Sequence, residues 1–308
     1  MHLAIRTHIL NRPCWNNTET KQQALEAMGK LVLKLNETRF KPIFARLVEW
    51  GAPPAGGGGD GDAEGRVGRA VALCKASVSL CDLLKSISVP YFTHLLDLFV
   101  AVLSGGHQPL FPASNEPASG TAPSSSKKKR KSPEASSQGA GTASHRGECA
   151  EYVLKALTGA FRHDTLGFIT KERFDLLLPA MVGFIEDSDP QCATLNRVDT
   201  LLAPALAQLA VAVQAGTGSD MCWQPLNRRL LNIFSASSPR VRAGAIGCTL
   251  AIVEKLGDEF VSLIPETVPA LVEALEDADE EVEKRARTLT SKIEDLLGES
   301  LNDFLVST

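Results

Sequence analysis

The sequence predicts an all-α fold: a HEAT-repeat α-solenoid, which is a superhelix of antiparallel helix pairs, with one disordered insert. The main observation is a helical pattern near the end of the chain that recurs forty-one residues later. Its first copy begins at residues 238–242 and ends at 256–257, and its second begins at 279–283 and ends at 297–298. A period of about 40 to 47 residues that carries two helices is typical of HEAT and armadillo repeats.

The aligned positions of the two copies hold the same residue types. They pair Val241 with Val282, Ala245 with Ala286, Leu256 with Leu297, and Gly257 with Gly298. A fainter copy supports the repeat, because residues 179–182 and 187–190 match residues 269–272 and 277–280 at an offset of about two repeats. Any two amphipathic helices can be aligned at some offset, but the shared valine, small-residue and Leu-Gly positions favour a solenoid.

Composition agrees with helices and limits the function. Of the 308 residues 44% are hydrophobic, and leucine and alanine dominate the periodic segments. The net charge of −4 means that any nucleic-acid contact must rest on a local patch. The seven cysteines include no CxxC pair and no zinc spacing, so we expect buried free thiols in a reducing compartment. Without a signal-peptide layout or an apolar run of about 18 residues, a soluble intracellular protein is expected.

The first predicted helices lie before the first glycine-rich segment. Residues 18–36 predict an amphipathic helix, and Asn36 and Thr38 predict a break followed by a new N-cap. We expect Pro42 in the first turn of the second helix, where its missing N–H costs little. This second helix is predicted to end at Trp50.

Two low-complexity segments divide the chain. Residues 51–65 hold seven glycines and two prolines and predict a mobile loop. Residues 104–147 are rich in Ser, Pro, Gly and Lys and are far longer than ordinary helix connections, so we expect a disordered linker. Helices are predicted at 67–87 and 91–103, an N-terminal helical block at 1–103, and a C-terminal HEAT-repeat block at 148–308. Both blocks fit one continuous superhelix.

A compact basic run lies within the predicted linker. It consists of Lys127, Lys128, Lys129, Arg130 and Lys131, and Ser132-Pro133 follows it as a weak candidate for phosphorylation. Five adjacent cations in an extended segment suit capture by an acidic groove, as in a nuclear localisation signal, or loose contact with phosphates. The alternative is a linker that increases solubility and that no import receptor binds. The lack of interspersed acids favours the nuclear signal.

A second basic feature lies near the repeat. It consists of Arg228, Arg229, Arg240 and Arg242, in a window (226–242) without any acid. On adjacent helices these arginines would form an edge that contacts RNA phosphates or acids. Phe234 is the window's one aromatic residue, so base reading is not expected. The alternatives are solvated helix ends, or pairing with carboxylates of residues 273–299, which hold ten acids against four bases.

The sequence contains none of the common catalytic motifs. GxxxxGK[ST], GxSxG and HExxH are absent, and the six histidines have no carboxylate at a helical offset that suggests acid/base work. His163 and Asp164 are adjacent, but neighbouring helical residues do not face each other. We therefore predict no catalytic residue, cofactor or metal, and a protein that is not an enzyme.

Four segments carry a family resemblance, at residues 39–51, 225–246, 263–283 and 296–301. In this order they resemble the C-terminal end of a very large HEAT-repeat family of the small-subunit processome. It is the family of U3 small nucleolar RNA-associated protein 10, known in animals as HEAT repeat-containing protein 1. The similarity covers about residues 1–100 and 148–305. The family's proteins are several times longer, and the glycine-rich loop and the Lys/Ser-rich insert depart from their pattern.

The resemblance implies a non-catalytic scaffold of the nucleus and nucleolus that acts in pre-18S rRNA processing. Implied partners are proteins of the early subcomplex that binds the 5′ external transcribed spacer, and U3 snoRNA or pre-rRNA, contacted directly or indirectly. The resemblance also implies a link to RNA polymerase I transcription, and neither a membrane nor a small-molecule substrate. The residues alone leave a protein-only HEAT adaptor open, of the nuclear-transport or phosphatase-scaffold type.

Overall fold

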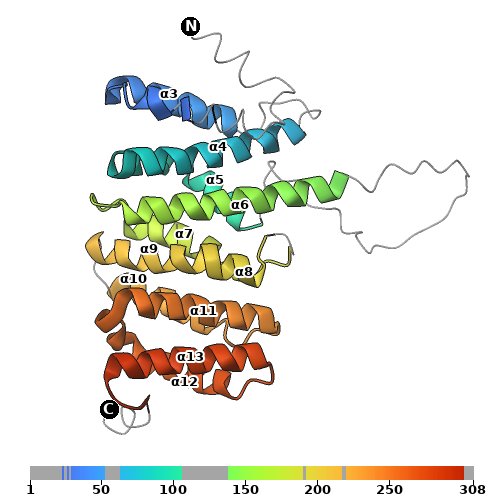
Figure 1. The fold of residues 1–308 in the computed structure, drawn as a ribbon, viewed down its shortest axis with the longest axis vertical. Coiled ribbons are helices and arrows are strands. Elements are labelled where there is room, and N and C mark those ends of the chain that lie inside the picture. Colours follow the sequence, from blue (N-terminus) through green and yellow to red (C-terminus); the bar gives the residue numbers. More distant parts are fainter. Residues whose placement is uncertain are drawn as a thin grey trace, which may run out of the picture.

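A computed structural model of the chain describes residues 29–52, 63–105, 138–189, 192–216 and 220–301, together with residues 23, 26 and 27. Within these ranges every element of secondary structure is helical, which confirms the predicted all-α class (Figure 1). The α-helices are α3 (Glu37–Gly51), α4 (Ala63–Leu84), α5 (Leu96–Leu103), α6 (Gln138–Arg162), α7 (Lys171–Gly183), α8 (Leu195–Arg197), α9 (Ala203–Gly216), α10 (Asp220–Leu231), α11 (Pro239–Leu256), α12 (Ile264–Leu275) and α13 (Glu280–Leu297).

Short helices of other types extend several of these elements. They are the 3-10 helices η3 (Lys85–Ile87), η4 (Val89–His94), η5 (Phe184–Glu186) and η7 (Gly257–Leu263), and the π-helix η6 (Val198–Leu202). The π turn of η6 joins α8 to α9 without a break. No described helix combines the length and the hydrophobicity that crossing a bilayer requires.

The helices form two layers of a solenoid. Helices α4, α6, α9, α11 and α13 pack side by side in this order, and α5, α7, α10 and α12 form the second layer behind them (Figure 1). Helices α3 and α13 lie at opposite ends of the stack. Because α4 packs directly on α6, the two predicted blocks belong to one continuous stack with a shared hydrophobic core.

The structure confirms the register of the forty-one-residue repeat. Helices α11 and α13 have 18 residues each, and Val241 and Val282 are both buried between the layers. The glycines that follow these helices, Gly257 and Gly298, have φ angles of 56° and 73°. A side chain with a Cβ rarely adopts such angles, so the Leu-Gly ending is a physical stop signal for each helix.

Helix α3 is held at its end of the stack by aromatic packing. The Phe40 and Phe44 rings meet the Tyr91 ring of η4 edge-on, with centroid distances of 4.9 and 5.3 Å. Such pairs contribute about 0.5–1.5 kcal/mol beyond the buried area. Gly51 ends the helix against α4, where a Cβ would lie 2.6 Å from the Leu73 side chain. A larger residue at position 51 would therefore push the two helices apart.

Several predicted boundaries differ from the structure. Helix α6 begins at Gln138, inside the predicted linker of residues 104–147, because a helix nucleated by packed residues such as Cys149 propagates toward its N-terminus at low cost. Gly51 and residues 63–65 of the predicted loop are helical. Ala52 forms a bend and Ser104 and Gly105 form a turn, whereas residues 53–62 and 106–137 lie outside the described part of the chain.

The start of α3 also differs from prediction. The Asn36 side chain accepts a hydrogen bond from the Arg39 N–H at 3.1 Å and caps the helix. The first turn therefore starts at Glu37, and Pro42 lies one turn later than expected, inside the helix. The helix predicted over residues 18–36 ends earlier, at residue 32, where a turn follows.

Candidate functional site

The predicted arginine edge lies where α10 and α11 meet. Arg228 and Arg229 lie in the last turn of α10, and Arg240 and Arg242 lie in the first turn of α11. Ser238 and Pro239 begin α11 in a conformation typical of an N-cap followed by Pro at N1. The four arginines thus belong to one repeat, as the sequence predicts, but their surroundings differ.

Arg242 is fixed by a two-pronged ion pair with the next repeat. Its Nε and Nη2 donate to the two carboxylate oxygens of Asp277, both at 2.7 Å, and its Nη1 donates to the Ala236 carbonyl at 2.8 Å. The two charged side chains are only 16% and 11% exposed. These hydrogen bonds are the main reason why the pKa of Asp277 is lowered. Arg242 therefore joins α11 to the turn before α13.

Arg240 is held by the main chain of the preceding repeat. Its Nη2 donates to the Asp187 carbonyl at 3.0 Å, and its Nη1 donates to the Ala193 carbonyl. Both carbonyls belong to the segment between η5 and α8. The guanidinium therefore satisfies backbone acceptors that would otherwise need water.

The two arginines of α10 are more accessible. Arg228 donates through Nε to Glu266 of α12, but its side chain remains 65% exposed. Arg229 is exposed as well. Phosphate contact by the four arginines stays a prediction, and the geometry divides them into an accessible pair on α10 and a pair on α11 that already binds the protein.

The same edge carries a row of further arginines that join neighbouring repeats. Arg146 of α6 pairs with Asp187, and Arg197 of α8 donates to the Gly147 carbonyl at 2.6 Å. Arg285 of α13 binds both carboxylate oxygens of Asp199 at 2.7 and 2.8 Å. These partners are 41 to 86 residues apart along the chain. Sequence reasoning missed them because only the stacking of repeats brings them together.

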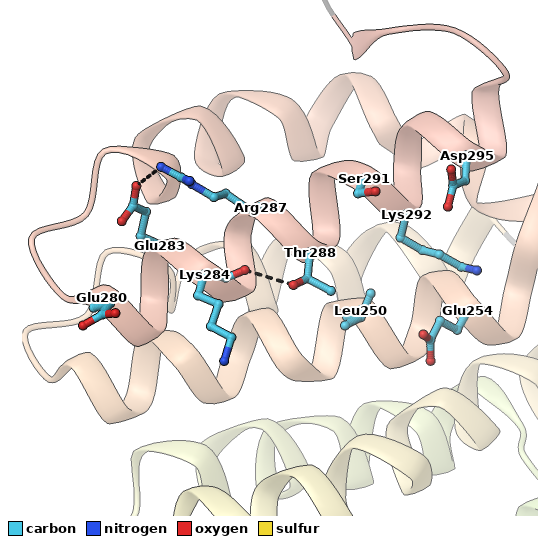
Figure 2. A pocket seen from close by; sticks show the side chains of 10 residues that line it. All are labelled: Leu250, Glu254, Glu280, Glu283, Lys284, Arg287, Thr288, Ser291, Lys292 and Asp295. Carbon is cyan, nitrogen blue, oxygen red and sulfur yellow. Dashed lines mark hydrogen bonds and ion pairs between the residues drawn. The ribbon is translucent and has the colours of Figure 1, made fainter.

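An open groove of 620 Å³ runs along α13 where it lies against α11 (Figure 2). It is lined by Leu250, Glu254, Glu280, Glu283, Lys284, Arg287, Thr288, Ser291, Lys292 and Asp295. In Figure 2 the side chain of Lys284 points from α13 toward α11. The mixed charges and the open shape of this groove suit contact with another macromolecule better than enclosure of a small molecule.

The described residues offer little chemical reactivity. They contain no group of three or more His, Cys, Asp or Glu side chains arranged to hold a metal ion. Burial raises the pKa of the Cys81 thiol to about 11 and that of the Cys192 thiol to about 12. Both thiols are therefore protonated at neutral pH, whereas a nucleophilic cysteine would need to be a thiolate. Asp164 accepts hydrogen bonds from the Phe168 and Ile169 N–H groups and shapes the turn before α7.

The basic run at residues 127–131 lies outside the described residues, so its role as a nuclear localisation signal stays a prediction. The same holds for the phosphorylation of Ser132.

Comparison with known proteins identifies what this arrangement resembles. Residues 7–169, slightly more than half of the chain, match the BP28CT (NUC211) domain. Over 94% of the chain, an uncharacterized protein of Arabidopsis thaliana is 29% identical. HEAT repeat-containing protein 1 of Homo sapiens is 26% identical over 93% of the chain, and U3 small nucleolar RNA-associated protein 10 of Coccidioides immitis is 28% identical over 93%. The chain spans only 12–14% of the length of these relatives.

Proposed function

The chain belongs to the family of the BP28CT (NUC211) domain, and we propose from this membership that it is a non-catalytic scaffold in ribosome biogenesis. The observation that carries the proposal is the match over more than nine-tenths of the chain to proteins named HEAT repeat-containing protein 1 and U3 small nucleolar RNA-associated protein 10. The solenoid supports it, because stacked helix pairs offer long surfaces on which several partners assemble.

At a finer level, the proposed place of action is the small-subunit processome of the nucleolus, in pre-18S rRNA processing. The proposed partners are proteins of the early subcomplex on the 5′ external transcribed spacer, together with U3 snoRNA and pre-rRNA, and RNA polymerase I transcription is the proposed linked process. The names of the fungal relatives favour the U3 particle.

The rigid stack explains how such a scaffold would work. The arginines Arg146, Arg240, Arg242 and Arg285 join successive repeats along one edge and so help to keep the surfaces of neighbouring repeats in register for their partners. The groove between α11 and α13 is one surface available for such a partner.

The proposal is tested by affinity purification of the tagged chain from cells, followed by sequencing of the associated RNA and imaging of the chain. Enrichment of U3 snoRNA and of the 5′ spacer, with nucleolar retention, is expected. A nuclear-envelope or cytoplasmic pattern without these RNAs would instead favour a protein-only HEAT adaptor.

A further inference from the structure

Helix α3, which lies beside α4 in the stack (Figure 1), carries an exposed stripe of side chains. The stripe consists of Arg39, Ile43, Arg46 and Trp50, which recur at the spacing of one helix face. Both arginines are exposed, Ile43 is 39% exposed, and Trp50 is partly exposed. The buried residues of α3, Phe40, Phe44 and Gly51, follow an adjacent face of the helix, which packs on α4 and η4. We call this set the α3 stripe.

The two arginines of the α3 stripe differ from Arg228, Arg240 and Arg242 of the α10–α11 edge, each of which binds another part of the protein. Among the residues that the structure describes, neither Arg39 nor Arg46 has an acidic partner, and no side-chain hydrogen bond occupies either guanidinium. Glu37, two residues before Arg39, lies on another face of α3, and Glu49, although it is only three residues after Arg46, forms no ion pair with it. Both guanidinium groups are therefore free to bind an anion from solution, without first breaking a contact that stabilises the fold.

Charge is also distributed unevenly along the solenoid. The end near α3 carries the further exposed lysines Lys34 and Lys41, whereas residues 273–299 at the other end hold ten acids against four bases. A polyanion that approaches the stack is therefore attracted to α3 and repelled from α13. An acidic protein would satisfy the arginines too, but the proposed function brings the chain to RNA, and the partly exposed Trp50 gives a base a ring to stack on.

We propose that the α3 stripe contacts single-stranded RNA, with Arg39 and Arg46 on phosphates and Trp50 stacking on a base. The inference rests on the proposed function, which brings the chain to RNA, and it adds the surface that makes the contact. Guanidinium groups bind phosphate oxygens, and aromatic rings stack on any base, so the contact is expected to show little sequence preference. The arginines lie seven residues apart, about 10 Å along the helix, and so bind different phosphates.

The test uses the full chain and a fluorescent 15-nucleotide oligouridine, with binding followed by fluorescence anisotropy at several salt concentrations. The double variant Arg39→Gln/Arg46→Gln is expected to bind more weakly, with a slope of log affinity against log salt that is shallower by about 1.4. Trp50→Leu is expected to weaken binding by about tenfold with an unchanged slope, because stacking releases no counterion.

The matched control is Arg162→Gln/Lys255→Gln, which removes two exposed cations from the last turns of α6 and α11. It is expected to leave both affinity and slope unchanged. Since Arg39 and Arg46 have no partner to lose, the melting temperature of their double variant is expected to stay within about 2 °C of the unmodified chain, which shows that the fold is intact.

Three outcomes would overturn the proposal. They are no binding of the oligonucleotide by the unmodified chain, a loss of binding in the Arg162/Lys255 control in place of the α3 variant, and an unchanged salt slope in the α3 variant. If the α3 variant binds oligouridine normally but no longer recovers U3 snoRNA from cells, the stripe contacts a protein. The proposed function fails separately, if the unmodified chain recovers neither U3 nor pre-rRNA.

Discussion

At the scale of single residues, arginine is the side chain that organises this solenoid. Arg146, Arg240, Arg242 and Arg285 each reach across a boundary between repeats, and their partners are carboxylates or main-chain carbonyls. The planar guanidinium suits this role because it donates several hydrogen bonds in fixed directions. A surface arginine in such a repeat can therefore bind the neighbouring repeat or remain available for a ligand. Only the structure distinguishes these two cases.

The Arg242–Asp277 pair gives a pH-dependent prediction. Because the pKa of Asp277 is lowered in the folded chain, the pair's contribution to stability is present above the carboxyl's unfolded pKa of about 3.9. This contribution is lost as the pH falls through the lower pKa that Asp277 has in the folded chain. Asp277→Asn is expected to cost about 2–4 kcal/mol at pH 7 and much less near pH 3. Urea unfolding at both pH values measures this, with the exposed Glu276→Gln as control, and an equal cost at both pH values would contradict it.

The buried cysteines give a second prediction at this scale. Among the residues that the structure describes, six cysteines are buried and none forms a disulfide, and burial raises the pKa of Cys81 and Cys192 far above neutrality. In a Cys14→Ser chain at pH 8, a thiol-reactive chromogenic disulfide is expected to label none of the six until denaturant is added. Rapid labelling of any one in the native chain would show that the solenoid opens locally at that helix.

At the scale of elements, the repeat register accounts for where α11 and α13, the second helices of two successive repeats, begin and end. Val241 and Val282 occupy equivalent buried positions in α11 and α13. Val241→Asp places an unpaired charge between the layers and is expected to destabilise the chain by about 3–5 kcal/mol. Thr288→Asp, at an exposed position of α13, is the control and is expected to change stability by less than about 0.5 kcal/mol. Chemical denaturation measures both, and a surface-like cost for Val241→Asp would argue against the register.

The basic run at residues 127–131 is an element of a different kind, because its expected action depends on charge and not on packing. Replacing its five cations with alanine is expected to reduce nuclear import, since the sequence contains no comparable cluster. The measurement is the nuclear-to-cytoplasmic ratio of a fusion too large to diffuse through nuclear pores. An unchanged ratio would leave the run as a solubilising segment.

Sequence reasoning predicted elements better than their junctions. The hydrophobic period and the Leu-Gly endings located α11 and α13, because both signals are local. The start of α6 was missed, because its first residues lack an amphipathic pattern and continue a helix that is packed further along. Of the joints between repeats, the Arg242–Asp277 pair fits the alternative that these arginines bind carboxylates of residues 273–299. The Arg285–Asp199 joint was missed, since its two residues are 86 positions apart and no local signal links them.

At the scale of the whole molecule, two layers of helices build a stack whose ends differ in charge and accessibility. The α3 end offers arginines and a tryptophan, and the α13 end is acidic. The sequence indicated the acidic end through its composition, but it did not single out α3, because the exposure of a helix face depends on what packs around it. Such an asymmetric stack suits a scaffold that holds RNA at one end and protein at the other.

The central claim is that this solenoid serves the production of the small ribosomal subunit. It is tested most directly by depleting the protein that bears this chain and measuring the precursors of both subunits' rRNAs by Northern blotting. The account predicts that early precursors of 18S rRNA accumulate and mature 18S falls, while processing of the large-subunit rRNA continues. Unchanged 18S precursors and unchanged mature 18S after full depletion would contradict it.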